Sequence, residues 1–168
     1  GTTGNPKGVL YSHRSTVLHS FHAAQPSTIN VGPHDAVLII APMYHANGWG
    51  VPYIAPMVGA KLVLPGPRMD PENLWELITQ EGVTLACAVP TVWSGLFDYV
   101  SGADKDLAPL KRALIAGVAV PQAMSDRFRQ RFGVEVLQFW GMTEMSPLGT
   151  IATSTPAVDS LPPAERVA

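Results

Sequence analysis

Five short runs of almost continuously apolar residues divide this chain. They cover residues 36–41, 61–64, 84–89, 113–116 and 134–139. Strands of a parallel sheet that is covered on both faces have this composition, because neither face of such a strand meets water. Between the runs, apolar residues recur instead at helical spacing. The pattern therefore predicts strands that alternate with helices.

Four segments combine helical spacing with residues that suit helix ends: residues 14–24, 71–81, 90–102 and 121–133. The second shows these signals most fully, since Asp70 can cap it, Pro71 suits its first turn and Gly82 suits its end. Strand–helix units joined by short connections imply right-handed crossovers. We therefore expect an α/β fold with a doubly wound, mostly parallel sheet and helices on both faces.

Residues that could bind a ligand or take part in catalysis follow four of the five apolar runs. These segments are PMYHANGWG at residues 42–50, PTVW at 90–93, GVAVP at 117–121 and WGMTEMSP at 140–147. In a doubly wound sheet, ligands bind outside the carboxyl ends of the strands. The glycine, aromatic and hydroxyl residues of the four segments therefore predict one site at one edge of the sheet, without indicating what it binds.

The chain begins with GTTGNPKGV, residues 1–9, which has the composition of an anion-binding loop. Its glycines let the backbone approach an anion, Thr2 and Thr3 offer hydroxyl donors, and Lys7 adds positive charge. It is not a Walker loop, because that motif needs Gly-Lys followed by Ser or Thr. Taken alone, the stretch fits a glycine-rich surface turn equally well.

Composition narrows the class of protein. Of the 168 residues, 46% are hydrophobic and 14% are charged, which is typical of one globular domain with a large core. The net charge of −2 gives no attraction to nucleic acid, and no apolar run approaches the roughly 18 residues of a membrane helix. The single cysteine, Cys87, excludes an internal disulfide and favours a reducing compartment, so we expect a cytoplasmic protein.

Three of these motifs, GTTGNPKGV, PMYHANGWG and WGMTEMSP, occur in the order and approximate spacing of the adenylate-forming enzymes. The chain resembles this superfamily of acyl-CoA synthetases, luciferases and peptide-synthetase adenylation domains over residues 1–150. Residues 45–78 are most similar to medium- and long-chain fatty acyl-CoA synthetases. The resemblance implies a central fragment of the large N-terminal domain, cut at both ends. Residues 1–150 are expected to form the AMP-binding α/β domain, and residues 151–168 a loop and the start of a further helix.

The resemblance implies a two-step reaction that uses ATP, Mg²⁺ and coenzyme A. A fatty-acid carboxylate attacks the α-phosphate of ATP to give acyl-AMP and pyrophosphate, and the thiol of CoA then displaces AMP. The acid is already ionised at neutral pH, so the first step needs positioning and charge neutralisation rather than a base. The implied partners are these small molecules and no nucleic acid. A homodimer of the full-length protein and a peripheral membrane contact for lipid uptake are compatible with the resemblance.

The resemblance also assigns roles to residues. The catalytic group comprises Thr143 at the α-phosphate, Glu144 as the Mg²⁺ ligand, His45 beside the acyl carboxylate, and Lys7. The nucleotide contacts are Thr2, Thr3, Gly4, Lys7, Gly117, Trp140, Gly141 and Thr143, with the Trp140 ring against adenine. The acyl group is bordered by His45, Trp49, Val89 and Trp93. Each role has a structural alternative. Glu144 could be a solvated surface acid, His45 a histidine packed in a loop, and the tryptophans ordinary core residues.

Departures from the family pattern leave the acyl length open. Ala116 and Phe139 stand where the family commonly has glycine, and they add bulk near the expected acyl and adenine pockets. The alternatives are an acyl-AMP ligase that passes its product to a carrier protein, an aromatic-acid CoA ligase, and a nucleotide-binding module without catalysis. His19 and His22, three residues apart, lack an evident third ligand for a metal. We expect the isolated fragment to be inactive, because the family's ribose-binding Asp and C-terminal lysine are missing.

Overall fold

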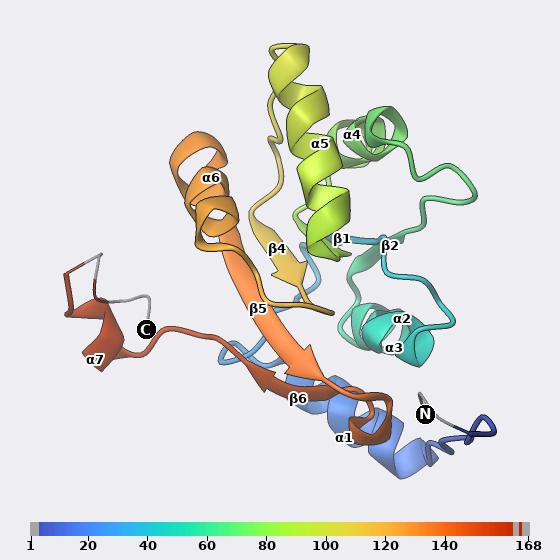
Figure 1. Cartoon of the computed structure of the whole chain (residues 1–168). Coiled ribbons are helices and arrows are strands. Elements are labelled where there is room, and N and C mark those ends of the chain that lie inside the picture. The colour runs from blue at the N-terminus through green and yellow to red at the C-terminus, as the bar shows by residue number, and fades with distance from the viewer. Residues whose placement is uncertain (1–3, 163–164, 166–168) are drawn as a thin grey trace.

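The computed structural model describes residues 4–162 and residue 165, and contains a six-stranded sheet between two layers of helices (Figure 1). The strands are β1 (Ala36–Ile39), β2 (Lys61–Val63), β3 (Leu85–Ala88), β4 (Arg112–Ile115), β5 (Glu135–Gly141) and β6 (Leu148–Ile151). Their order is β2-β1-β3-β4-β5-β6. The first five strands are parallel, and β6 pairs antiparallel with β5. The predicted doubly wound, mostly parallel sheet is confirmed.

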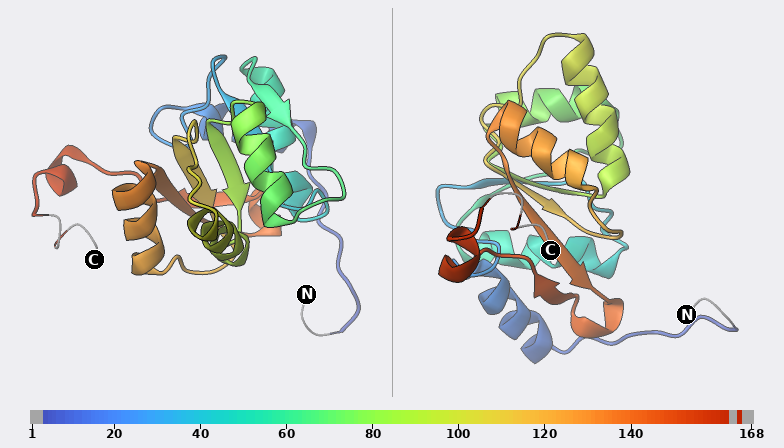
Figure 2. Two further views of the ribbon diagram at one scale, coloured as in Figure 1. Left: turned by 90° about the horizontal axis from the view of Figure 1, so that it is seen from above. Right: turned by 60° about the vertical axis from the view of Figure 1, so that its left-hand side comes forward.

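Helices cover both faces of the sheet, as Figure 2 shows from two further directions. One face packs against α4 (Pro71–Gln80), α5 (Pro90–Gly102) and α6 (Gln122–Phe132). The other packs against α1 (His13–Ala24) and α3 (Val51–Met57), with the short α2 (Ala46–Trp49) beside α3. The short helix α7 (Pro156–Asp159) follows β6. Among the described residues, no helix combines the length and apolarity that crossing a bilayer would require.

Local chemistry explains where the longer elements begin. Ser12 caps α1, because its side chain accepts a hydrogen bond from the Ser15 amide at 3.0 Å. Asp70 caps α4 in the same way through the Asn73 amide at 3.0 Å. Every residue of β1 and β3 is buried, which explains why these strands read as unbroken apolar runs. The four predicted helices and five predicted strands are all present, with ends that differ by no more than two residues.

Apart from the single 3-10 turn Thr143–Met145, four elements were not predicted: β6 and the helices α2, α3 and α7. β6 contains Gly149 and is only partly buried, so its sequence carries no strong strand pattern. The helix α3 has proline at positions 52 and 56, and such residues usually indicate a loop. The chain after Ile151 runs through a loop into α7, and most of the expected further helix lies outside the described residues.

A largely buried ion pair lies at the amino ends of the strands, at the edge of the sheet away from the predicted site. The Arg112 guanidinium pairs with Asp35 and also donates to the Ile29 carbonyl at 2.9 Å. Asp35 accepts further hydrogen bonds from the Thr84 hydroxyl at 2.6 Å and from the Gly32 amide at 2.9 Å. Burial acts to raise the pKa of Asp35, but these hydrogen bonds and the Arg112 charge outweigh it and hold the pKa below its usual value.

Candidate active site

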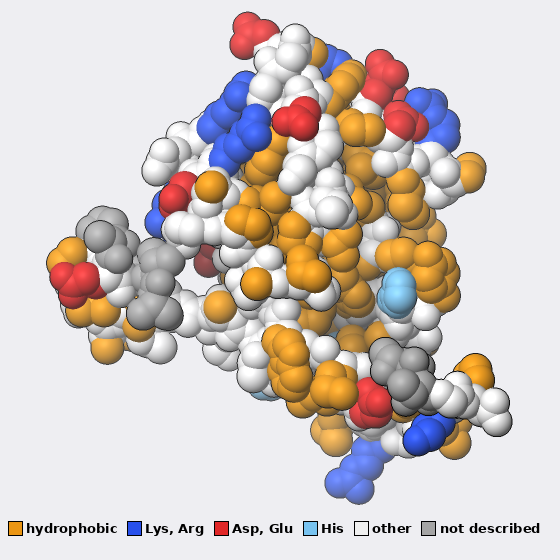
Figure 3. Space-filling model, viewed as in Figure 1, with side chains coloured by type: hydrophobic (Ala, Val, Ile, Leu, Met, Phe, Trp, Pro, Cys, Tyr) orange, Lys and Arg blue, Asp and Glu red, His pale blue; other side chains and the backbone are white. Residues whose placement is uncertain are grey.

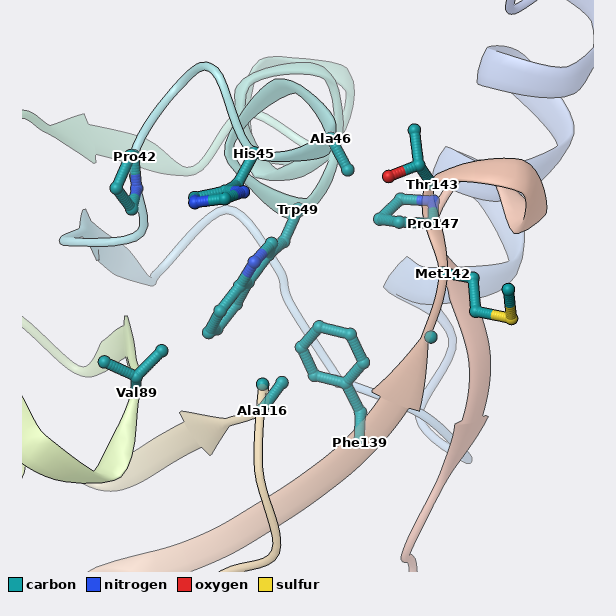
Figure 4. A pocket seen from close by; sticks show the side chains of 12 residues that line it. Pro42, His45, Ala46, Trp49, Val89, Ala116, Phe139, Met142, Thr143 and Pro147 are labelled. Carbon is teal, nitrogen blue, oxygen red and sulfur yellow. The ribbon is translucent and has the colours of Figure 1, made fainter. Parts of the chain in front are cut away.

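A cavity of about 300 Å³ opens at the carboxyl ends of β1, β3, β4 and β5 (Figure 4). The chain passes from β1 to β2 on one side and then to β3 on the other, so strand order reverses next to β1. Open α/β sheets bind ligands at such a reversal. The cavity is lined by Pro42, His45, Ala46, Trp49, Val89, Ala116, Gly117, Phe139, Gly141, Met142, Thr143 and Pro147.

A left-handed turn after β1 brings two of these side chains to the cavity. All five residues from Ala46 to Gly50 have positive φ, between 43° and 77°. This conformation costs roughly 1–2 kcal/mol for each residue that is not glycine. Backbone hydrogen bonds oppose the cost, since the His45 amide donates to the Pro42 carbonyl at 2.9 Å and the Gly48 amide donates to the His45 carbonyl at 3.0 Å. The turn directs both His45 and Trp49 into the cavity (Figure 4).

One half of the cavity is apolar. The Trp49 ring meets Phe139 edge to face, with the two ring centroids 5.0 Å apart. Val89 and Ala116 lie across from them at the ends of β3 and β4 (Figure 4). Apolar side chains also dominate the middle of this face of the molecule, whereas charged side chains gather toward its two ends (Figure 3). This half can therefore bury an aliphatic group.

The other half is formed by the connection between β5 and β6. The Met142 amide donates to the Pro147 carbonyl at 3.0 Å, which closes the connection around a single turn of 3-10 helix, Thr143–Met145. Thr143 lies at the cavity, while Glu144 is exposed beside it. The Tyr11 hydroxyl donates to the Thr143 carbonyl, so the connection is joined to the N-terminal segment that carries Lys7. Burial, together with the Glu144 charge, raises the pKa of Tyr11.

Six of the thirteen predicted site residues line the cavity. Those in its lining are His45, Trp49, Val89, Gly117, Gly141 and Thr143. Glu144 is adjacent, and Gly4 and Lys7 are exposed in the N-terminal segment. Thr2 and Thr3 lie outside the described residues.

The two remaining predicted tryptophans are placed differently from Trp49. Trp93 belongs to α5 and is fully buried in the core. Its ring packs edge to face on Phe128 of α6, with the two ring centroids 4.9 Å apart. It is therefore not brought to the cavity lining. Trp140 is 56% exposed on β5, beside the cavity residue Gly141 in the chain, and its ring packs against Gly149. An exposed ring of this kind can stack on a planar base.

Sequence reasoning missed two residues that hold the site together. Tyr11 contacts the Thr143 carbonyl, and its only signal was a position four residues after Lys7. His19 was considered only as a metal ligand, yet its Nε2 accepts a hydrogen bond from the Leu148 amide.

Across the part of the chain that the structure describes, no three histidine, cysteine or acidic side chains cluster as a metal site. The exposed carboxylate of Glu144 suits Mg²⁺, which needs only one or two protein carboxylates when phosphates supply other ligands.

Comparison with known proteins gives close matches. The family model described as AMP-binding enzyme matches residues 1–167. The medium-chain-fatty-acid–CoA ligase of Ectopseudomonas oleovorans is 51% identical over 167 residues, which are 99% of this chain and 31% of that protein. The 3-methylmercaptopropionyl-CoA ligase of Ruegeria lacuscaerulensis is 51% identical over 150 residues, which are 89% of this chain and 28% of that protein.

Solved structures agree with these relatives. The N-terminal domain of FACL13 from Mycobacterium tuberculosis matches with a TM-score of 0.81 and 28% sequence identity, over 90% of this chain and 38% of that chain. The chain spans about a third of the length of the curated relatives it matches.

Proposed function

The chain belongs to the AMP-binding enzyme family, and we propose that it is a segment of a fatty acyl-CoA synthetase. The observation that carries this proposal is the two-sided cavity at the reversal of strand order. Its apolar half, around Trp49 and Phe139, suits an aliphatic chain, and its polar rim, with His45 and Thr143, suits a carboxylate and a phosphate. Few other reactions need an aliphatic acid and a phosphate to meet at one point.

In the proposed first step, the ionised carboxylate lies beside His45 and attacks the α-phosphate of ATP, which forms acyl-AMP as the bond to the β-phosphate breaks and pyrophosphate leaves. The Thr143 hydroxyl orients that phosphate, and Lys7 with the rest of the N-terminal loop binds the β- and γ-phosphates. Glu144 would hold Mg²⁺, and the bound ion would supply positive charge that offsets the charge of the phosphates. Because the acid needs no deprotonation, the residues contribute mainly in-line positioning and electrostatic stabilisation. The Trp140 ring stacks on adenine, and the thiol of CoA takes the acyl group in a second step.

The apolar lining suits an aliphatic acid, and a medium chain is our proposal for its length. Ala116 and Phe139 both line the cavity, where each adds more bulk than a glycine would. A volume of about 300 Å³ is at the lower end of the usual range for ligand sites. A relative with 51% identity is named for medium-chain fatty acids. A cytoplasmic location, a homodimer and a peripheral membrane contact remain proposals based on the sequence and the resemblance.

The test uses the full-length protein that contains this chain. Purified protein is incubated with ATP, Mg²⁺ and saturated fatty acids of increasing length, and pyrophosphate release is measured. We expect release that depends on the fatty acid and acyl-CoA formation that depends on free CoA. Pyrophosphate release without any use of CoA would favour an acyl-AMP ligase, and no release with any acid would leave only a nucleotide-binding module.

A pair of histidine variants locates the activity in the cavity. His45→Ala removes a side chain from the lining, whereas His34→Ala removes an exposed histidine from the loop before β1. We expect the first to reduce fatty-acid-dependent pyrophosphate release about 10²-fold and the second to leave it unchanged. Equal activity in both variants would contradict the assignment of the cavity as the active site.

A further inference from the structure

His19 lies outside the cavity, at a junction of three segments. It extends from the middle of α1 toward the left-handed turn at residues 46–50 and toward the β5–β6 connection. These three segments enclose a recess too small for a water molecule, whose lining includes Tyr11, Asn47, Gly50 and Ser146. The imidazole is half-buried there.

The imidazole contacts both halves of the active site from behind. Its Nε2 atom accepts a hydrogen bond of 3.3 Å from the Leu148 amide, directly after the cavity residue Pro147. Its adjacent Cε1–Nδ1 edge packs on Gly50, the last residue of the left-handed turn. A Cβ atom on Gly50 would lie only 2.6 Å from Cε1 and 2.9 Å from Nδ1 of His19. The ring and the turn are therefore in close contact.

We infer that His19 is a positioning residue for the adenylation step, an inference that rests on the proposed function. The Cε1–Nδ1 edge packs against the turn that carries His45 and Trp49, and Nε2 holds the connection that carries Thr143. The acyl half and the phosphate half of the cavity come from segments about a hundred residues apart in the chain, so their spacing depends on such a link. His19 touches neither substrate.

The contact specifies the protonation state of the ring. Nε2 can accept from the Leu148 amide only when it carries no proton, so the imidazole is neutral with its hydrogen on Nδ1. Burial and the nearby His22 lower the pKa of His19, which favours this form. The other titratable groups around it are Tyr11 and Tyr53, with Glu144 beside Tyr11.

Two substitutions of His19 distinguish a role of its hydrogen bond in positioning the site from a role of its volume in packing. His19→Leu keeps an apolar volume and removes the acceptor, whereas the Oε1 atom of His19→Gln can take the place of Nε2. His22→Leu is the matched control, because His22 lies one turn along the same helix and is exposed. All variants are made in the full-length protein. Their melting temperatures are recorded to verify that each variant is folded at the temperature of the assay.

Two measurements are made on each variant. The first is the kcat and KM of fatty-acid-dependent pyrophosphate release, and the second is hydrogen exchange at the Leu148 amide. We expect His19→Leu to lower kcat by about 10- to 100-fold, with KM for ATP changed less than threefold, and to speed exchange at Leu148. His19→Gln should recover most of the rate and the protection, and His22→Leu should match wild type in both.

Each outcome bears on a different claim. A wild-type kcat in His19→Leu, or a His19→Gln protein no better than His19→Leu, would overturn the positioning role. An inactive wild-type protein whose Leu148 amide is still deprotected only by His19→Leu would instead overturn the proposed function and leave the structural link in place.

Discussion

Gly141 marks the point where the active-site connection leaves the sheet, and it offers a sharp test of that geometry. It is the last residue of β5, at a shift in the register between β5 and β6. A Cβ atom placed on Gly141 would lie 2.0 Å from the Pro147 carbonyl oxygen and 3.0 Å from its carbonyl carbon. A carbon–oxygen contact normally needs about 3.3 Å. The Gly141→Ala substitution must therefore move backbone against backbone by more than about 1 Å.

The expected effect on activity follows from what that movement displaces. The Pro147 carbonyl accepts the hydrogen bond from Met142 that closes the connection at 3.0 Å, and its loss costs about 1 kcal/mol of stability. Thr143 lies inside the same closed connection and lines the cavity. A misplacement of about 1 Å at a reacting group commonly costs about 10² in rate. We therefore expect Gly141→Ala to fold with modestly reduced stability and to lose about 99% of its adenylation activity.

The assay is fatty-acid-dependent pyrophosphate release by the full-length protein, with the melting temperature recorded in parallel. Gly102→Ala is the matched control, since no atom lies within 4 Å of the added Cβ at that helix end. We expect the control to keep the wild-type rate. A wild-type rate in Gly141→Ala would refute both the close backbone approach and the role of the β5–β6 connection in catalysis.

Three further predictions concern the charges and the apolar wall. Glu144→Gln should keep the fold, because the side chain is exposed, and should slow ATP–pyrophosphate exchange by about 10²–10³; a wild-type exchange rate would remove Glu144 from the site. Trp49→Ala should shift the preferred acyl length gradually, since one methylene is worth about 1 kcal/mol, and an unchanged length profile would return Trp49 to a packing role. The lowered pKa of Asp35 adds stability that is complete above its unfolded value of 3.8 and is lost as pH falls through the folded value. Acid unfolding followed by circular dichroism should therefore be less steep below pH 4 in Asp35→Asn, and an identical acid transition would contradict the role of the Arg112 pair.

Most of the fold could be predicted because its strands are buried on both faces. β1 and β3 contain only buried residues, so their runs of apolar letters reflect the layered architecture directly. The strand β6 could not be predicted in this way. Its pairing depends on the reversal of the chain between Gly141 and Pro147. The hydrogen bond that closes this reversal joins Met142 and Pro147, and the neighbouring residues Thr143 and Leu148 are bound by the distant side chains of Tyr11 and His19.

The left-handed turn at residues 46–50 shows a second limit of sequence reasoning. Its glycines at positions 48 and 50 indicated a loop, but Ala46, Asn47 and Trp49 also take positive φ, which their side chains disfavour. Such a conformation is stable only when the surrounding structure imposes it. His45 and Trp49 could be predicted as site residues from the sequence. The left-handed conformation that turns both side chains into the cavity could not.

The comparison of two tryptophans shows why candidate residues could not be sorted before the structure was known. Trp49 and Trp93 both follow a buried strand within a short distance, and both were predicted to border the acyl group. Trp49 lies in a turn that opens at the sheet edge. Trp93 is instead in the first turn of α5, whose buried face points toward the sheet and α6. Whether a tryptophan after a strand lines the cavity or packs in the core therefore depends on whether a turn or a helix follows that strand.

The N-terminal helix connects these features, although it contributes no residue to the cavity lining. Lys7 belongs to the proposed phosphate loop, and the same segment continues through Tyr11, which binds the Thr143 carbonyl, into α1, which carries His19. His19 then contacts the Leu148 amide and Gly50, so one continuous stretch of 13 residues, from 7 to 19, meets both halves of the site. The spacing between the acyl wall and the phosphate rim is therefore set by contacts behind the cavity as well as by the sheet. Substitutions on the inner side of α1 should consequently affect adenylation more than substitutions at its exposed positions, even though neither group touches a substrate.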